Sequence, residues 1–253
     1  MKKIVSVLLF ISFFILSVSA RATQAHSEGK DTKWERLRRG EVVSDGGYLE
    51  TGGVWGRMEA FIEAPPRVIW RLFLAANDWN RYGLPSLADS RTVTEEIGHL
   101  SSQTENIHDV YHILSGRVFD PFANQKPGAQ WINYALQHYD LPWPVKNRWM
   151  ILKNTNDESR SLIGTYRTDW VKVAGNVKTV TGGVTLQAVA GEPEMTYLTY
   201  HVESNPGSSV PKFILKWGVR RSMPAAIRVI RREAARIYGK PARYLPNTSQ
   251  LRK

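Results

Sequence analysis

The sequence predicts an α+β protein in which a curved antiparallel sheet wraps around one long C-terminal helix. A strand-like run at residues 196–203 stops at a turn over residues 205–211 that is rich in proline, glycine and serine. A long helix with many aromatic and arginine residues follows, interrupted only by Pro224. Strands mostly follow one another instead of alternating with helices, which is typical of α+β folds.

The first part of the domain is expected to contain strands and one helix. Residues 34–37 favour a helical turn, and residues 41–50 a hairpin whose turn is Asp-Gly-Gly at residues 45–47. Residues 54–62 alternate well enough for a strand. A helix over residues 64–75 begins with two prolines, which are tolerated in the first helical turn.

The middle of the chain is a succession of strands with one excursion. Strands are expected at residues 91–96 and 108–114. Residues 119–140 break the strand rhythm, and within them residues 129–138 favour a short helix. Turn-forming sequences then separate four more strands, at residues 148–154, 161–173, 178–190 and 196–204.

The first 22 residues have the pattern of a signal peptide. A basic start precedes an apolar stretch over residues 4–18, and Ala20 and Ala22 form a small-x-small cleavage site. The apolar stretch is shorter than the ~20 residues that a helix needs to span a bilayer. We therefore expect cleavage after Ala20 or Ala22 and an exported protein, periplasmic or extracellular. One folded domain over residues 34–240 and a flexible tail over residues 241–253 would follow.

The composition is that of a folded protein with a basic surface. Apolar residues make up 42% and aromatic residues 11%, which excludes a disordered chain. The chain has no cysteine, so disulfides and a lipid-modified cysteine are excluded. Its formal charge of +11 falls to +8 when cleavage removes two lysines and one arginine. Such a charge suits an anionic membrane surface, whereas export and the absence of a nucleic-acid-binding motif argue against nucleic acid.

Three segments resemble the START lipid-binding domains and the wider START-like superfamily, also called SRPBCC or helix-grip proteins. They are the strand-to-helix entry at residues 63–70, the Trp-Pro-Val segment at residues 141–148 and the entry into the last helix at residues 206–213. All three occur in the expected order across residues 34–240. The resemblance implies a helix-grip fold around an apolar tunnel. The chain departs from the pattern at residues 119–140, which are longer and more aromatic than expected.

The sequence offers no clear catalytic or metal site. His108 and His112 would share one face of the predicted strand. No third ligand with suitable spacing is evident, and zinc sites use three or four. There is no glycine-rich phosphate loop, cysteine nucleophile or Gly-x-Ser-x-Gly elbow. We therefore expect neither catalysis nor a metal or other cofactor.

The residues expected to bind the ligand are large and mostly aromatic. Trp143 lies in a Pro-x-Pro segment and Trp217 on the last helix. The excursion at residues 119–140 and the turn at residues 205–211 are expected to form the mouth of the cavity, because long non-strand excursions are often lids or binding loops. The full set of candidate ligand-binding residues is Trp143, Trp217, Met223, Tyr111, Trp149, Trp131 and Tyr134.

The last helix combines an apolar face with a basic one. At about 100° per residue, its apolar residues around Ile227 gather within an arc of roughly 120°. Arg228, Arg231 and Arg232 lie on the flank and the opposite face. They are candidates for contact with anionic lipid headgroups, and an ordinary solvated face is the alternative.

These observations predict an exported binding or carrier protein for a hydrophobic small molecule, such as a lipid, isoprenoid or sterol-like compound. Burial of apolar surface at about 25 cal/mol per Å² would drive its uptake. Two alternatives remain: a START-like enzyme of the cyclase or hydrolase type, and a peripheral membrane interaction module without a ligand cavity. We expect a monomer whose partners are the ligand and, as a candidate, an anionic membrane surface, without nucleic acid.

Overall fold

The computed structural model describes residues 32–84, 86–141, 146–207 and 212–239, with the backbone alone for residues 212–221. The helices are α2 (Lys33–Arg38), α3 (Pro66–Leu74), α4 (Glu95–Ser101), α5 (Ile107–Ile113) and α6 (Lys212–Tyr238), with single 3₁₀ turns η1 (Ala76–Asp78) and η2 (Ser161–Ile163). The strands are β1 (Val43–Tyr48), β2 (Val54–Ile62), β3 (Leu87–Val93), β4 (Gln130–Tyr139), β5 (Arg148–Asp157), β6 (Thr165–Gly175), β7 (Thr179–Val189) and β8 (Glu192–Asn205).

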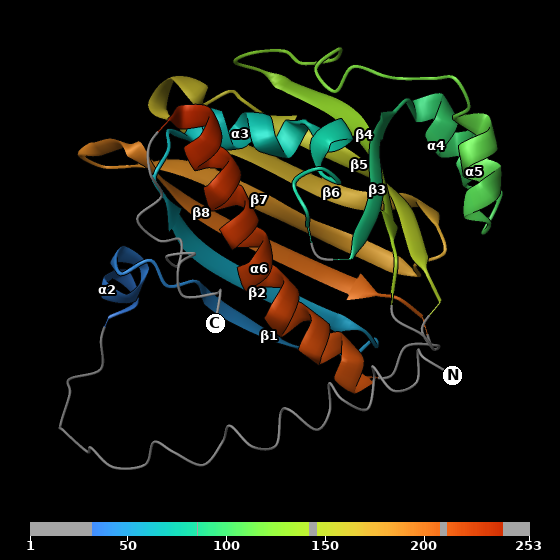
Figure 1. The fold of residues 1–253 in the computed structure, drawn as a ribbon, viewed down its shortest axis with the longest axis horizontal. Coiled ribbons are helices and arrows are strands. Elements are labelled where there is room, and N and C mark those ends of the chain that lie inside the picture. Colours follow the sequence, from blue (N-terminus) through green and yellow to red (C-terminus); the bar gives the residue numbers. More distant parts are fainter. Residues whose placement is uncertain (1–31, 85, 142–145, 208–211, 240–253) are drawn as a thin grey trace, which may run out of the picture. The chain divides into compact units, whose positions relative to one another are not determined.

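The eight strands form one antiparallel sheet in the order β1-β2-β8-β7-β6-β5-β4-β3 (Figure 1). Strands β3 to β8 are sequential neighbours, which follows from the short turns between most of them. The last strand returns to pair with β2, so the two ends of the domain meet next to the edge strand β1. Helix α6 then lies against β1, β2 and α3.

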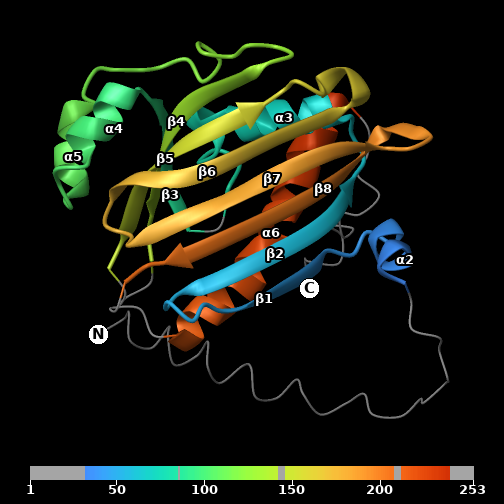
Figure 2. The same cartoon turned by 180° about the vertical axis from the view of Figure 1, so that it is seen from behind.

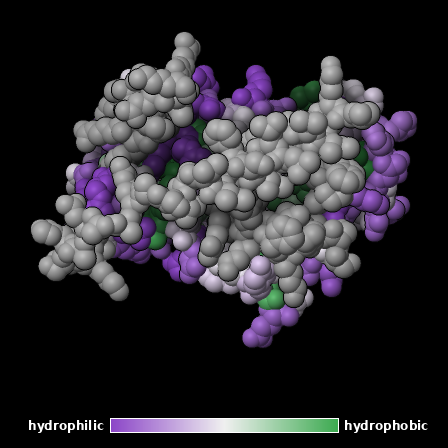
Figure 3. All heavy atoms as spheres, turned by 60° about the horizontal axis from the view of Figure 1, so that its bottom comes forward, coloured by the Kyte–Doolittle hydropathy of each residue, from purple (hydrophilic) through white to green (hydrophobic). Residues whose placement is uncertain are grey.

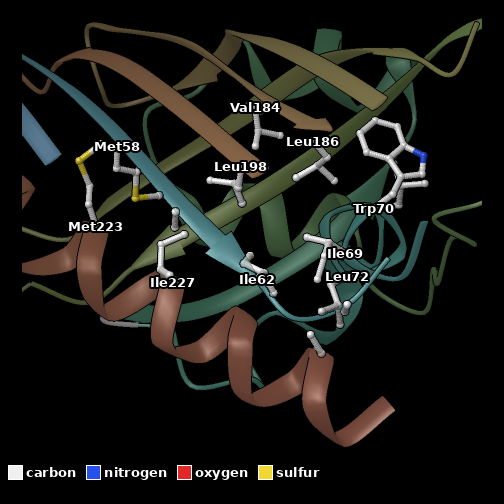
Figure 4. Packing of buried hydrophobic residues seen from close by; sticks show 14 of the residues in the cluster. Met58, Ile62, Ile69, Trp70, Leu72, Val184, Leu186, Leu198, Met223 and Ile227 are labelled. Atoms are coloured by element: carbon white, nitrogen blue, oxygen red, sulfur yellow. The ribbon is translucent and has the colours of Figure 1, made fainter. Parts of the chain in front are cut away.

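The main core lies on the face of the sheet that carries α3 and α6, which we call the inner face. Side chains alternate along each strand, and directly paired residues share a face. The inner-face side chains can therefore be read from the strand register. Figure 4 shows how strands β2, β7 and β8 meet the two helices in one buried cluster, including Met58, Ile62, Ile69, Trp70, Leu72, Val184, Leu186, Leu198, Met223 and Ile227.

A second core lies on the opposite, outer face. Helices α4 and α5 cover β3 to β6 there, whereas Figure 2 shows the outer face of the other strands with α6 behind the sheet. The buried apolar side chains of this cluster are Val93, Ile97, Val110, Leu114, Tyr134, Leu136, Trp149, Ile151 and Ala174. Strands β4 and β5 are consequently buried on both faces.

The short helices begin at capping residues that the sequence supplies. Thr94 accepts a hydrogen bond from the backbone N–H of Ile97 at the start of α4, at 3.3 Å. Asn106 accepts one from the backbone N–H of His108 at the start of α5, at 3.1 Å. Such caps satisfy N–H groups that have no partner inside the helix.

Several sequence predictions are confirmed. The helical turn at residues 34–37, the strand at residues 54–62 and the helix at residues 64–75 correspond to α2, β2 and α3. The four later strands correspond to β5 to β8. Helix α6 runs through Pro224 without a break.

The hairpin predicted over residues 41–50 is wrong. This segment contains β1, which pairs with β2 and places Gly47 opposite Trp55. A Cβ at Gly47 would lie 2.8 Å from Trp55 Nε1, so the glycine is required by the tryptophan ring that covers it. The chain turns later, where Gly52 and Gly53 have positive φ angles of +83° and +104°.

Two further element types are wrong. Residues 108–114 lie mostly in helix α5, because the capping side chain of Asn106 starts a helix there. Residues 129–138 belong to strand β4 instead of a helix. Burial on both faces places apolar side chains on both sides of β4, at Trp131 and Tyr134 among others, and this hides the two-residue period of a strand.

The coloured surface in Figure 3 is mostly hydrophilic, with small apolar patches between the polar side chains. This agrees with the placement of the large apolar clusters inside the domain. None of the helices in the described ranges has the length and hydropathy that a bilayer-crossing segment requires.

Candidate ligand-binding site

The inner face has an apolar half formed by β2, β7 and β8. Met58, Val184 and Leu198 lie on it and are at most 2% exposed. Helix α6 packs over this half with Met223 and Ile227, which are 4% and 0% exposed (Figure 4). This half provides an aliphatic wall.

The other half of the inner face, on β3 to β6, is polar. Asn133 of β4 lies directly opposite Asn154 of β5, and Asn156 of β5 lies opposite Thr168 of β6. Asn133, Asn156 and Thr168 are at most 7% exposed. With two hydroxyl residues of β3, these side chains form what we call the polar patch: Ser90, Thr92, Asn133, Asn154, Asn156 and Thr168.

The hydrogen-bonding capacity of the polar patch is only partly used. The Asn156 amide donates to Asn133 Oδ1 at 3.0 Å, whereas each primary amide offers two donors and an acceptor. Three hydroxyl oxygens of the patch, those of Ser90, Thr92 and Thr168, are buried and have no hydrogen-bond partner among the described residues. Buried hydroxyl groups are normally paired, so these three require an explanation.

Aromatic rings border the polar patch. Trp170 and Tyr200 lie with their ring centroids 5.3 Å apart. The Trp170 ring lies over Gly182, where a Cβ would come within 2.7 Å of the ring. Glycine at this position therefore lets the indole lie flat against the sheet.

Two tyrosines of the inner face lie deep in the protein, yet each keeps part of its surface accessible. Burial raises the pKa of Tyr139 to about 12, and burial together with the nearby Tyr139 raises the pKa of Tyr200. The Tyr139 hydroxyl donates to Gln137 at 2.7 Å. Lys172, opposite Leu152, has its pKa lowered by burial.

A buried carboxylate closes the end of the sheet near η2. Glu158 is 4% exposed, and its Oε1 accepts hydrogen bonds from Trp70 Nε1 at 2.9 Å, Gln125 at 2.9 Å and Trp131 Nε1 at 3.1 Å. These donors come from α3, the segment before β4, and β4 itself. Glu158 therefore ties this segment to the two elements beside it.

The structure brings only some of the predicted ligand-binding residues to the inner face. Met223 and Trp131 lie in the inner core. Tyr134, Trp149 and Tyr111 lie on the outer face, so they do not line the space beneath α6. Trp131 and Tyr134 are buried strand residues on opposite faces of β4, which corrects their assignment to a non-strand lid. Trp143 lies outside the described residues, and so does the side chain of Trp217.

The prediction of a basic lipid-facing surface on α6 is wrong for Arg231. This side chain is 4% exposed. It donates to the carbonyl of Phe61 from Nε at 3.1 Å and Nη2 at 2.8 Å, and to that of Gly40 from Nη1 at 2.8 Å. Arg228 and Arg232 are exposed, and Arg232 also forms an ion pair with its neighbour Glu233.

An open pocket of about 530 Å³ lies on the outer face beside β3 and α5. The Tyr111 hydroxyl is hydrogen-bonded to His138 Nδ1 at 2.9 Å, and Arg91 lies 5.3 Å from the Tyr111 ring centre. Asp89 pairs with Arg91 at 2.7 Å. Throughout the described part of the chain, no three histidine, aspartate or glutamate side chains are grouped as a metal site requires.

Comparisons with solved structures show the same fold at low sequence identity. The STAR-related lipid transfer protein from Xanthomonas axonopodis is 16% identical with a TM-score of 0.54, and the alignment covers 81% of this chain and 96% of that one. Human StAR-related lipid transfer protein 5 is 10% identical with a TM-score of 0.51, covering 93% and 95%. No family model and no curated protein matches the sequence. The fold is therefore the START-like helix-grip fold predicted from the sequence.

Sequence reasoning missed the polar patch. Its members are far apart in the chain and become neighbours only through the register of β3 to β6. Asn154 ends the strand predicted at residues 148–154, and Asn156 lies beyond it in a stretch that was assigned to a turn because asparagine is depleted in strands.

Proposed function

We propose that this protein binds a hydrophobic small molecule between the inner face of the sheet and α6, and that it carries or shields this molecule after export. The observation that carries the proposal is the interior itself. An aliphatic wall under α6 faces the same space as a buried polar patch whose hydroxyl groups have no partner in the described residues. A bound molecule with an apolar part and a polar group would fill such an interior and pair with these hydroxyl groups.

Partly accessible side chains support an internal hollow. Tyr139, Trp170, Tyr200 and Val202 all lie on the inner face and all keep some accessible surface. A fully packed core leaves few voids larger than a water molecule. Ligand pockets are usually lined by apolar and aromatic side chains with a few polar groups, and this composition is present here.

We favour binding over catalysis for the same site. The polar patch consists of neutral amides and hydroxyls, and no acid–histidine pair lies among the described inner-face residues beside it. Both structures compared above are named as lipid transfer proteins, which is consistent with a binding role.

The signal-like segment at residues 1–22 supports export as part of this proposal. N-terminal sequencing of the protein from a culture supernatant or periplasmic extract should start near Thr23. A protein that retains Met1 in the membrane fraction would contradict export.

Native mass spectrometry tests the binding function. The protein is purified without detergent and its mass is compared before and after solvent extraction. The expected result is an extra mass that is removed with the solvent, together with uptake of the neutral dye Nile red by the extracted protein. A polypeptide of unchanged mass that takes up no Nile red would show that the inner face is completely packed.

A further inference from the structure

The polar patch can form hydrogen bonds and the aliphatic wall cannot, so the two halves of the inner face favour different parts of a ligand. We propose that it binds an uncharged hydrogen-bonding group, an alcohol or a carbonyl, of an amphiphile whose hydrocarbon part lies along β2, β7 and β8. This inference rests on the proposed function, because it concerns the same interior. It narrows the ligand from any hydrophobic molecule to one with a neutral polar end.

The first argument is that the polar patch contains unsatisfied hydrogen-bonding groups. The hydroxyl oxygens of Ser90, Thr92 and Thr168 are buried, and the described part of the chain offers them no hydrogen-bond partner. Leaving a buried polar group unpaired costs free energy, whereas a valine in place of a threonine avoids that cost. A ligand hydroxyl offers both a donor and an acceptor, and a carbonyl offers an acceptor. Either group would satisfy side chains that the protein leaves unsatisfied.

The second argument is the lack of charge at the patch. Its members are amides and hydroxyls, so a carboxylate or phosphate buried there would have no ion-pair partner within the patch. Glu158 is already engaged by three N–H donors. The two described lysine and arginine side chains of the inner face on these strands, Lys172 opposite Leu152 and Arg148 opposite Tyr139, lie outside the patch. The patch therefore suits a neutral head better than an anionic one.

The third argument is the position of the patch relative to the apolar half. Thr168 of β6 pairs with Val184 of β7, and Val184 pairs with Tyr200 of β8. Polar and aliphatic side chains are therefore adjacent along one row of the sheet. Neighbouring strands are about 4.8 Å apart, so a molecule lying across this row meets both halves within a few bond lengths.

Three probes with the same C18 chain test the inference: oleyl alcohol, oleate and 1-octadecene. The affinity of each probe is measured by its displacement of Nile red from the extracted full-length protein. We expect oleyl alcohol to bind at least about tenfold more tightly than octadecene and at least as tightly as oleate. Equal binding of the alcohol and the alkene would overturn the proposal, and so would a preference for oleate.

Thr168→Val removes one patch hydroxyl with little change in shape, and Thr92→Val is a second variant of the same kind. Either should reduce the preference for the alcohol over the alkene by about fivefold, the effect of one hydrogen bond. Neither should lower thermal stability, because an unpaired hydroxyl is lost. The matched control is Thr185→Val on the outer face of β7, which should leave the preference unchanged.

The outcomes separate this inference from the proposed function. If no probe and no Nile red binds, the binding function itself fails. If all three probes bind equally and Thr168→Val changes nothing, the binding function stands and the inference fails. In that case, the hydroxyl groups are satisfied by buried water, which such polar sites also accept.

Discussion

Arg231 provides the sharpest test of how α6 is held on the sheet. Its guanidinium group is buried and donates to the carbonyls of Phe61 at the end of β2 and Gly40 after α2. These contacts join three segments that are far apart in the sequence. We predict that Arg231→Met, which keeps the apolar stem of the side chain, destabilises the fold by about 2 kcal/mol.

This magnitude follows from the contacts. Two carbonyl oxygens lose a charged donor, and such hydrogen bonds contribute about 1.5 kcal/mol each at the lower end of their range. Removing a buried charge recovers part of its desolvation cost, for which we subtract about 1 kcal/mol. For a domain of this size, about 2 kcal/mol lowers the melting temperature by roughly 4–8 °C.

The matched control is Arg228→Met, three residues earlier on the same helix and exposed. Exposed substitutions usually change stability by no more than about 0.5 kcal/mol. Thermal unfolding followed by circular dichroism, with urea unfolding to check the slope, measures both variants. Equal melting temperatures for the two variants would refute the role of Arg231 as a structural clamp.

Three other predictions address titration, membranes and the apolar wall. Because the pKa of Tyr139 is raised from 10.0 to about 12, its contribution to stability is complete below pH 10 and is lost as the pH rises toward 12. Tyr139→Phe should therefore reduce the fall of the melting temperature between pH 10 and 12. A melting temperature that falls as steeply in the variant as in the wild type would argue against this role of Tyr139. Arg228→Gln with Arg232→Gln should slow probe exchange with anionic vesicles at low salt, with little effect on neutral vesicles or at high salt. Equal exchange rates of the variant and the wild type with anionic vesicles at low salt would show that the basic face of α6 is not a docking surface. Val202→Ala should weaken the binding of oleyl alcohol and of octadecene by a similar factor, up to about tenfold, because it removes apolar surface alone. A changed ratio between the two probes would contradict the division of the inner face into two halves.

The sequence was most informative where each local signal agreed with the fold. The strands from β5 to β8 are separated by turn residues and show recognisable strand patterns, so their order was predicted correctly. Helix α6 was also predicted, because a proline- and glycine-containing turn precedes it and its apolar residues follow a helical period. Pro224 does not end the helix, since the backbone continues through it.

The sequence was misleading where burial or capping overrode periodicity. Strand β4 carries Trp131 on the inner face and Tyr134 on the outer face, and both are buried. A strand covered on both faces carries large buried side chains on each face, so apolar and polar residues do not alternate along it. Helix α5 is short, and its strongest signal was the single capping residue Asn106. Predicting either element required knowledge of what packs against it.

The candidate site depends even more on tertiary structure. The aliphatic wall follows from strand patterns that the sequence displays, but the polar patch exists because of register. Asn133 and Asn156 come into hydrogen-bonding distance through the pairing of β4 with β5. A shift of that pairing by one residue would turn one of these strands over relative to the other. No local pattern in a single strand specifies this contact between side chains of two strands.

The two halves of the inner face are also held by different parts of the fold. Helix α6 packs on β1, β2 and α3, and Arg231 fixes it there through Phe61 and Gly40. The polar patch lies on β3 to β6, whose opposite face is supported by α4 and α5. In the binding function proposed above, closure over the hydrocarbon part of the ligand and recognition of its polar end therefore depend on separate elements. Substitutions in the patch can change head-group preference while the clamp on α6 stays intact, because more than one strand separates them and distant sites act nearly additively.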